Sequence, residues 1–243
     1  MSIKYKIEFR VSKDPFLTPR QREMAQAIGS LLAISAPIRP AFFTFIILHQ
    51  HYRTITQKEK ILELYLKRMV ISRKIDAYEE AFCKELEASF ALTQENNNFV
   101  KFVSSIFEYY VEAIMQLTHG SSIIISSNVL INGNKFTAHG NNTVDLAIDK
   151  LDESSKILIL AECCLTMRRL QTKTEQICFY AELLKTIREI VGGKAILKFE
   201  MIVANNERSN WHNVNFQSLD MLRDNDVDIK GRTLISEQVY RQF

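Results

Sequence analysis

The chain has 243 residues, of which 47% are hydrophobic and 24% charged, and its formal net charge is +3. This length suits one large domain with a sizeable core. The ordinary composition, with only seven glycines and four prolines, excludes extensive disorder and a turn-rich β-sandwich. A net charge this small gives little indication of a polyanionic partner.

The cysteine content and the hydropathy pattern predict the compartment. Four cysteines in a chain of this length do not resemble a disulfide framework, and no apolar signal-peptide core follows the N-terminal lysines. The most apolar region, residues 24–48, is interrupted by Pro37, Arg39 and Pro40. No uninterrupted run reaches the roughly 18–20 residues of a transmembrane helix. We therefore expect a soluble, intracellular, cytoplasmic protein without disulfides.

The first half of the chain begins with one strand and continues with helices. Apolar and charged residues alternate over residues 2–11, which predicts a half-buried strand. Thr18, Pro19 and Gln21 have the spacing of a helix start with a capping box. Further helical patterns follow that start, and the predicted helices span residues 18–35, 40–48, 56–92 and 99–117.

The second half mixes strand and helix signals. Asn132-Gly133 between two apolar runs predicts a hairpin over residues 129–137, because this pair readily adopts a type I′ turn. A helix over 172–191 ends at Gly192-Gly193 and is followed by an alternating strand at 195–204. Residues 143–151 look helical. Residues 156–170 fit either a helix or a strand, and we favour a helix. A strand at 211–216 and a terminal helical turn at 236–243 complete the predicted elements.

These elements predict an α+β fold. It would be predominantly helical, with a small, mostly antiparallel sheet built from the N-terminal strand, the central hairpin and the late strand near 195–204. Because the first and the late strand show the same alternation, we expect both in one sheet. The expected organisation is a single domain, 1–243, with a helical block at about 17–118 and an α/β portion at about 119–243.

Two adjacent cysteines, Cys163 and Cys164, are the first candidates for catalysis. A cysteine nucleophile needs a depressed pKa and a nearby base, and His212 and Asp220 follow in the order of a Cys-His-Asp arrangement. No signature residues surround either cysteine. Burial as small apolar side chains is the stronger interpretation.

Histidines and glycines suggest no metal or cofactor site. His49 and His51 lie in a predicted helix, where they would point about 200° apart and fail to share an ion. Gly140 stands before a predicted helix but lacks the lysine or the glycine spacing of a phosphate-binding loop, so a helix cap at Asn142 or Thr143 explains it. We expect neither a metal nor a cofactor.

A basic segment, Lys67–Lys74, is the one candidate for nucleic-acid binding. Lys67, Arg68, Arg73 and Lys74 lie within about two helical turns, which would suit phosphate contacts. Acidic residues follow at once, so a solvated face of mixed charge is the simpler interpretation.

For each candidate catalytic motif, a purely structural role explains the residues at least as well as catalysis does. We therefore expect an intracellular binding or adaptor protein that acts through a helical surface on a protein partner, in the manner of a microbial effector directed at a host protein. The alternative is a cysteine-dependent hydrolase or transferase that uses Cys163 or Cys164 with His212. Nucleic-acid binding through Lys67–Lys74 is a weaker alternative.

Overall fold

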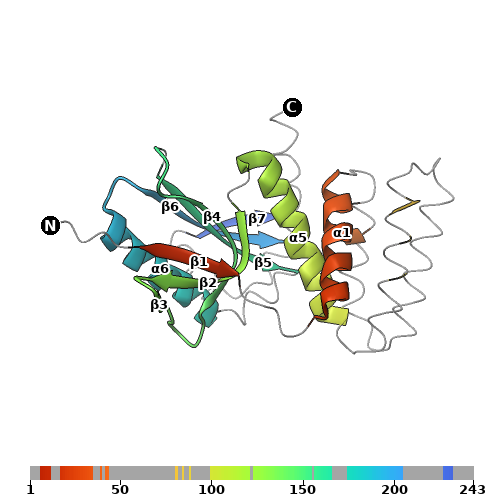
Figure 1. Ribbon diagram of the computed structural model, residues 1–243, viewed down its shortest axis with the longest axis horizontal. Coiled ribbons are helices and arrows are strands. Elements are labelled where there is room, and N and C mark those ends of the chain that lie inside the picture. The colour runs from red at the N-terminus through yellow and green to blue at the C-terminus, as the bar shows by residue number, and fades with distance from the viewer. Residues whose placement is uncertain are drawn as a thin grey trace, which may run out of the picture. The chain divides into compact units, whose positions relative to one another are not determined.

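The computed structural model describes residues 6–11, 17–34, 39, 42–43, 80–81, 84, 88, 99–120, 123–154, 156–165, 174–204 and 227–231. The chain divides into two compact units, Met1–Asp14 with Met115–Phe243 and, between them in sequence, Pro15–Ile114. The elements are α1 (Pro19–Ile34), α5 (Phe99–His119), α6 (Thr174–Val191) and strands β1 (Ile7–Val11), β2 (Ile123–Ile131), β3 (Asn134–Lys135), β4 (Thr143–Lys150), β5 (Ile157–Cys164), β6 (Ile196–Val203) and β7 (Val227–Gly231) (Figure 1).

The fold is mixed α/β and is organised on a seven-stranded sheet with the order β1-β2-β4-β5-β6-β7, in which β3 pairs with β2. Neighbouring strands from β1 to β5 are antiparallel. Strands β5, β6 and β7 are parallel. The prediction of a predominantly helical fold with a small, mostly antiparallel sheet is therefore wrong. The first and the late strand do share one sheet, as predicted, although β2, β4 and β5 lie between them.

Two segments assigned to helices account for the wrong fold class. Residues 143–151 correspond to β4, where Val144, Leu146 and Ile148 alternate with Asp145 and Asp149 at the period of a strand. Residues 156–170 begin with β5, which is buried along most of its length. Such a short apolar run fits a buried helix and a central strand equally well, and only its neighbours decide between them.

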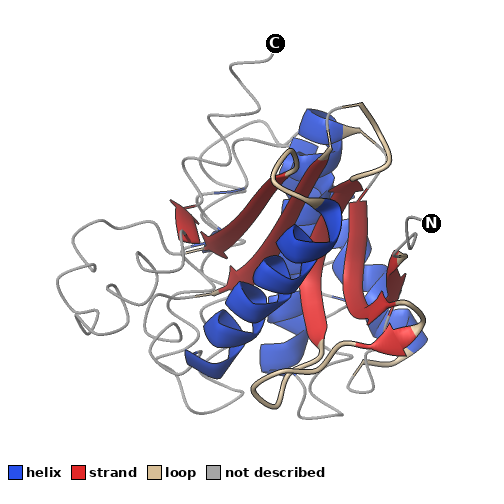
Figure 2. Cartoon of the chain, turned by 90° about the vertical axis from the view of Figure 1, so that its left-hand side faces the viewer, coloured by secondary structure: helices blue, strands red, loops and turns tan. Residues whose placement is uncertain are grey.

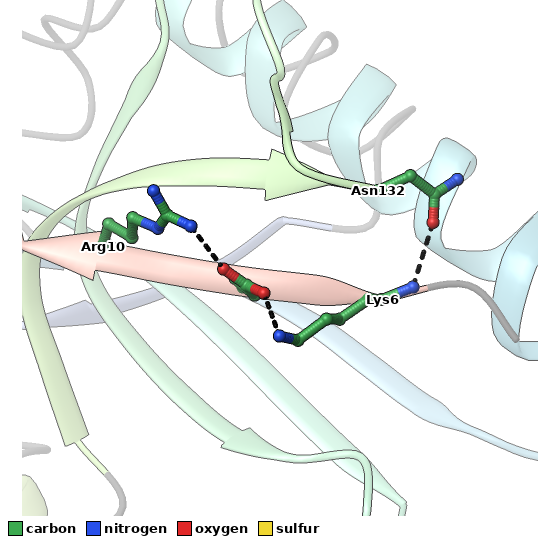
Figure 3. Close-up of polar contacts among 4 residues, drawn as sticks. Lys6, Arg10 and Asn132 are labelled. Carbon is green, nitrogen blue, oxygen red and sulfur yellow. Dashed lines mark hydrogen bonds and ion pairs between the residues drawn. The ribbon is translucent and has the colours of Figure 1, made fainter.

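The N-terminal strand closes one edge of the sheet through its pairing with β2, in the register Ile7–Ile131 to Val11–Ser127. The predicted turn joins β2 to β3, and its residues Asn132 and Gly133 have φ angles of 54° and 81°. Asn132 also accepts a hydrogen bond from the Lys6 amide at 3.0 Å (Figure 3). On β1 itself, the Glu8 carboxylate pairs with both Lys6 and Arg10. Charges of this kind protect an edge strand against pairing with other chains.

Helix α6 connects the parallel strands β5 and β6 and lies across the sheet (Figure 2). Its apolar face supplies Ile177, Phe179, Tyr180, Leu183 and Ile187 to the core of this unit, where they join side chains of β2, β4, β5 and β6. The helix ends as predicted at Gly192, whose φ is +77° and whose amide bonds to the Arg188 carbonyl at 3.0 Å.

In the other unit, α1 begins with the predicted capping box. The Gln21 side chain accepts from the Thr18 amide at 2.9 Å, and the Gln21 amide donates to Thr18 Oγ1 at 3.2 Å. At the other end of α1, the buried Arg39 side chain donates to the carbonyls of Leu32 and Ala33. Gly29 faces α5 at a distance that leaves little room for a side chain.

Several predicted elements lie wholly or mostly outside the described residues. These are the helices at 40–48 and 56–92, the strand at 211–216 and the terminal turn at 236–243. The expectation of a single domain stays a prediction.

Candidate functional site

A polar cluster lies at the edge of the sheet where parallel strands β5 and β6 end. Because β4 runs antiparallel to β5, its amino end reaches the same edge. The first turn of α6 lies there too, since the Gln176 side chain in that turn donates to the Thr143 carbonyl of β4 at 3.2 Å. Carboxyl ends of parallel strands are the usual ligand-binding edge of an α/β sheet. We call Asp145, Glu162, Gln176 and Tyr180 the carboxylate cluster.

The Tyr180 hydroxyl is the centre of this cluster. It accepts a hydrogen bond from the Asp145 amide at 3.2 Å and donates to Glu162 Oε2 at 2.9 Å. The Ala161 carbonyl lies 3.2 Å away and offers a second, longer acceptor for the same proton. One hydroxyl of helix α6 thus joins β4 to β5.

Both acidic side chains contact groups of the neighbouring strand or helix. Asp145 Oδ2 accepts from the backbone amide of Cys163 at 2.8 Å, across from β4 to β5. Glu162 Oε2 accepts from Gln176 Nε2 at 3.3 Å in addition to the Tyr180 hydroxyl. Leu146 of β4 is paired with Ala161 of β5. Asp145 directly precedes Leu146 and Glu162 directly follows Ala161, so the two acidic residues lie next to the same pair on neighbouring strands.

The cluster is buried on one side and partly exposed on the other. Tyr180 is 0% exposed and Glu162 is 3% exposed, whereas Asp145 and Gln176 are partly exposed. Burial raises the pKa of Tyr180 well above its ordinary value, and the charges of Glu162 and Asp145 raise it further. The hydroxyl therefore keeps its proton at physiological pH and remains a hydrogen-bond donor. Strongly shifted pKa values concentrate at functional sites, and buried structural networks shift them as well.

The ring of Tyr180 is fixed by packing. It stacks on Phe199 of β6 with the ring centroids 4.1 Å apart and the planes 11° apart, and it contacts Phe179 edge-on. These contacts hold the ring in the core and direct its hydroxyl toward the two strands.

The cysteines predicted as candidate nucleophiles lie beside this cluster. Cys163 is partly buried, and its backbone amide is the donor to Asp145. Cys164 is 2% exposed and belongs to the apolar core under α6. Their predicted partners His212 and Asp220 lie outside the described residues, as do His49, His51 and Lys67–Lys74. The pairing of a cysteine with His212 therefore stays a prediction.

The loop at His139-Gly140 forms a turn between β3 and β4 and does not precede a helix. Both residues have positive φ angles, and Ala138 pairs with Asn141 across the turn. The expectation of a helix cap at Asn142 or Thr143 is wrong, because strand β4 begins there.

Sequence reasoning missed the carboxylate cluster because it placed Asp145 and Glu162 in helices. The alternation around Asp145 was the available signal for a strand. Gln176 and Tyr180 are four residues apart in the predicted helix, so they share one of its faces. Nothing in the sequence shows that this face meets the Glu162 carboxylate and the Asp145 amide.

Two further findings concern metal ligands and membrane-spanning helices. Among the described residues, no group of three or more His, Cys, Asp or Glu side chains is placed to hold a metal ion. No helix in the described part of the chain has the length and hydropathy to cross a membrane.

Comparison with known proteins leaves the family open. No protein-family model matches the chain, and no curated protein matches it significantly. Among solved structures, the chain is similar to the crystal structure of protein VC1899 from Vibrio cholerae, at 11% sequence identity and a TM-score of 0.36. The match covers 98% of this chain and 58% of that protein, so the chain spans little more than half of its length.

Proposed function

We propose that the carboxylate cluster binds a divalent cation and that the protein uses it to act on a phosphate-bearing substrate. One observation carries this proposal: at the edge where the parallel strands end, the Tyr180 hydroxyl accepts from the Asp145 backbone amide of β4 and donates to the Glu162 carboxylate of β5, while the Asp145 carboxylate accepts from the Cys163 amide of β5. Mg²⁺ is typically held by one or two carboxylates, and substrate phosphates and water complete its coordination.

The roles follow from the positions of the side chains. Asp145 and Glu162 would supply the oxygen ligands, and the partly exposed side of the cluster would admit the substrate. A cation held there would lower the pKa of a bound water and polarise a phosphoryl oxygen. Hydrolysis of a phosphate ester is the reaction class we propose, because substrate phosphates commonly complete the coordination of a Mg²⁺ held by one or two carboxylates. This proposal departs from the expectation, drawn from the sequence, that no metal is bound.

The functions expected from the sequence have weaker support. A nucleophilic cysteine must be accessible, and the burial of Cys164 does not favour that role. Binding of a protein partner, and nucleic-acid binding through Lys67–Lys74, stay predictions.

Thermal unfolding with and without divalent cations tests cation binding. A cation that binds only the native state at about 100 times its Kd stabilises the protein by about 2.7 kcal/mol. We expect MnCl2 or MgCl2 to raise the melting temperature of the native protein, and EDTA to reverse the rise. Asp145→Asn should abolish the rise, because the amide still accepts the Cys163 hydrogen bond but has lost the charge.

Asp149→Asn is the matched control, because Asp149 lies on the same strand and contacts the Leu151 amide. It should leave the cation-dependent rise unchanged. A rise of equal size in Asp145→Asn and in native protein would contradict the proposal. Hydrolysis of bis(p-nitrophenyl) phosphate and of p-nitrophenyl phosphate, with and without Mn²⁺, would then test the substrate class.

A further inference from the structure

We infer that Tyr180 and Gln176 are positioning residues that hold the Glu162 carboxylate in one orientation. The effect of this orientation on cation affinity rests on the proposed function, because a fixed carboxylate binds a cation more tightly than a mobile one. Its basis is that two donors from one face of α6 reach the same oxygen, Glu162 Oε2, at 2.9 and 3.3 Å.

The geometry makes Tyr180 the stronger of the two donors. Its hydroxyl has one proton, and Glu162 Oε2 is a closer acceptor than the Ala161 carbonyl and carries charge. Hydrogen bonds to a charged acceptor are roughly twice as strong as neutral ones. Gln176 divides its amide group between Glu162 and the Thr143 carbonyl, at 3.3 and 3.2 Å.

The surroundings of Tyr180 limit how far its hydroxyl can move. The ring is fully buried and stacked on Phe199, and the Asp145 amide donates to the hydroxyl from the opposite strand. The orientation of Glu162 is thereby coupled to the spacing of β4 and β5. Because the Tyr180 hydroxyl is fixed and Gln176 donates to the same oxygen, we expect one rotamer of Glu162, which would set the direction of its second oxygen.

Tyr180→Phe is the decisive variant, because it removes the hydroxyl and keeps the ring that packs on Phe199. In crystals of metal-free protein, we expect Glu162 in one rotamer in native protein and in more than one in the variant. In titrations with Mn²⁺, we expect the variant to bind roughly 10–100-fold more weakly, the usual effect of removing a group that orients a metal ligand. Gln176→Met should have a smaller effect of the same kind.

Tyr110→Phe is the control, since Tyr110 is also 0% exposed but belongs to α5. It should change neither the Glu162 rotamer nor the affinity for Mn²⁺. An unchanged Glu162 rotamer in Tyr180→Phe would overturn the inference, and so would an unchanged Kd in a native protein that binds Mn²⁺. If native protein binds no Mn²⁺ but Glu162 loses its single rotamer in the variant, the positioning role stands and the proposed function is wrong.

Discussion

Gly29 on α1 lies in close contact with α5. A Cβ atom at this position would stand 2.7 Å from the Cβ of Tyr109 and 2.8 Å from the backbone nitrogen of Tyr110. Alanine in a helix interior is usually about 1 kcal/mol better than glycine. Here the contact with backbone atoms outweighs that gain, because one of the helices would have to shift. We expect Gly29→Ala to destabilise the protein by about 1–3 kcal/mol, measured by urea unfolding.

Ser30→Ala provides the comparison for this prediction, since Ser30 is the next residue on α1 and is exposed. It should leave the free energy of unfolding unchanged or raise it slightly, as helix propensity alone dictates. Equal stabilisation by both substitutions would show that the two helices are not in close contact at Gly29.

Asp149 on β4 makes one part of the stability depend on pH. Burial raises the pKa of its carboxyl above the ordinary value of 3.8; a hydrogen bond from the Leu151 amide opposes the rise, and the Asp152 charge adds to it. Between the ordinary and the raised pKa, the native state binds more protons than the unfolded chain. Stability contributed by this group therefore falls as pH rises through that range.

Asp149→Asn removes this titration and keeps an acceptor for the Leu151 amide, which lies 3.1 Å from Oδ1. We expect a flatter dependence of melting temperature on pH just above pH 3.8, and a variant at least as stable as native protein at pH 7. The exposed Glu153→Gln serves as the reference. Superimposable pH profiles of native protein and Asp149→Asn would argue that the Asp149 carboxyl is not desolvated.

At the level of single residues, little of the candidate site could be predicted. Tyr180 lies in the helix predicted at 172–191 and is buried among its apolar residues. Its hydroxyl, however, makes hydrogen bonds to atoms of β4 and β5 that are 18 to 35 residues away in sequence. No local pattern specifies such a pairing, because it depends on which strand lies under the helix.

At the level of elements, local chemistry predicted the starts and ends well. The capping box of α1, the Asn132-Gly133 turn and the Gly192 stop were confirmed, since each depends on a few neighbouring residues. The nature of β4 and β5 was not predicted. Short apolar segments acquire their conformation from hydrogen bonds with other strands. Because this effect is non-local, β4 and β5 were predicted as helices and the predicted fold class was wrong.

Strand β1 supplies a prediction at this level. Phe9 is partly buried against the core of the sheet unit, whereas Glu8 pairs with Lys6 and Arg10 in an exposed setting (Figure 3). We expect Phe9→Ala to lower the free energy of unfolding by about 1–3 kcal/mol through the loss of apolar contact. Glu8→Ala should have a much smaller effect, because exposed ion pairs contribute little to stability. Chemical denaturation of both variants tests this, and a larger loss in Glu8→Ala would show that charges hold the strand.

At the level of the whole molecule, the chain inserts one compact unit into another. Pro15–Ile114 interrupts a unit that begins with Met1–Asp14 and resumes at Met115. Each unit has fully buried side chains of its own, such as Leu32 on α1 and Leu160 on β5. Compact units with separate cores commonly open as separate cooperative units, which hydrogen exchange detects.

We expect Leu160→Ala to weaken the sheet unit and leave the protection of α1 unchanged. Replacing a fully buried leucine by alanine costs about 2–5 kcal/mol, through lost transfer free energy and the cavity that remains. Amides of β4, β5 and β6 should exchange faster in this variant, while the amides of α1 after Pro19 keep native rates. Leu32→Ala should give the reciprocal pattern. If either substitution accelerates exchange in both sets of amides to the same extent, the two units unfold together, and the chain behaves as the single domain that its sequence predicts.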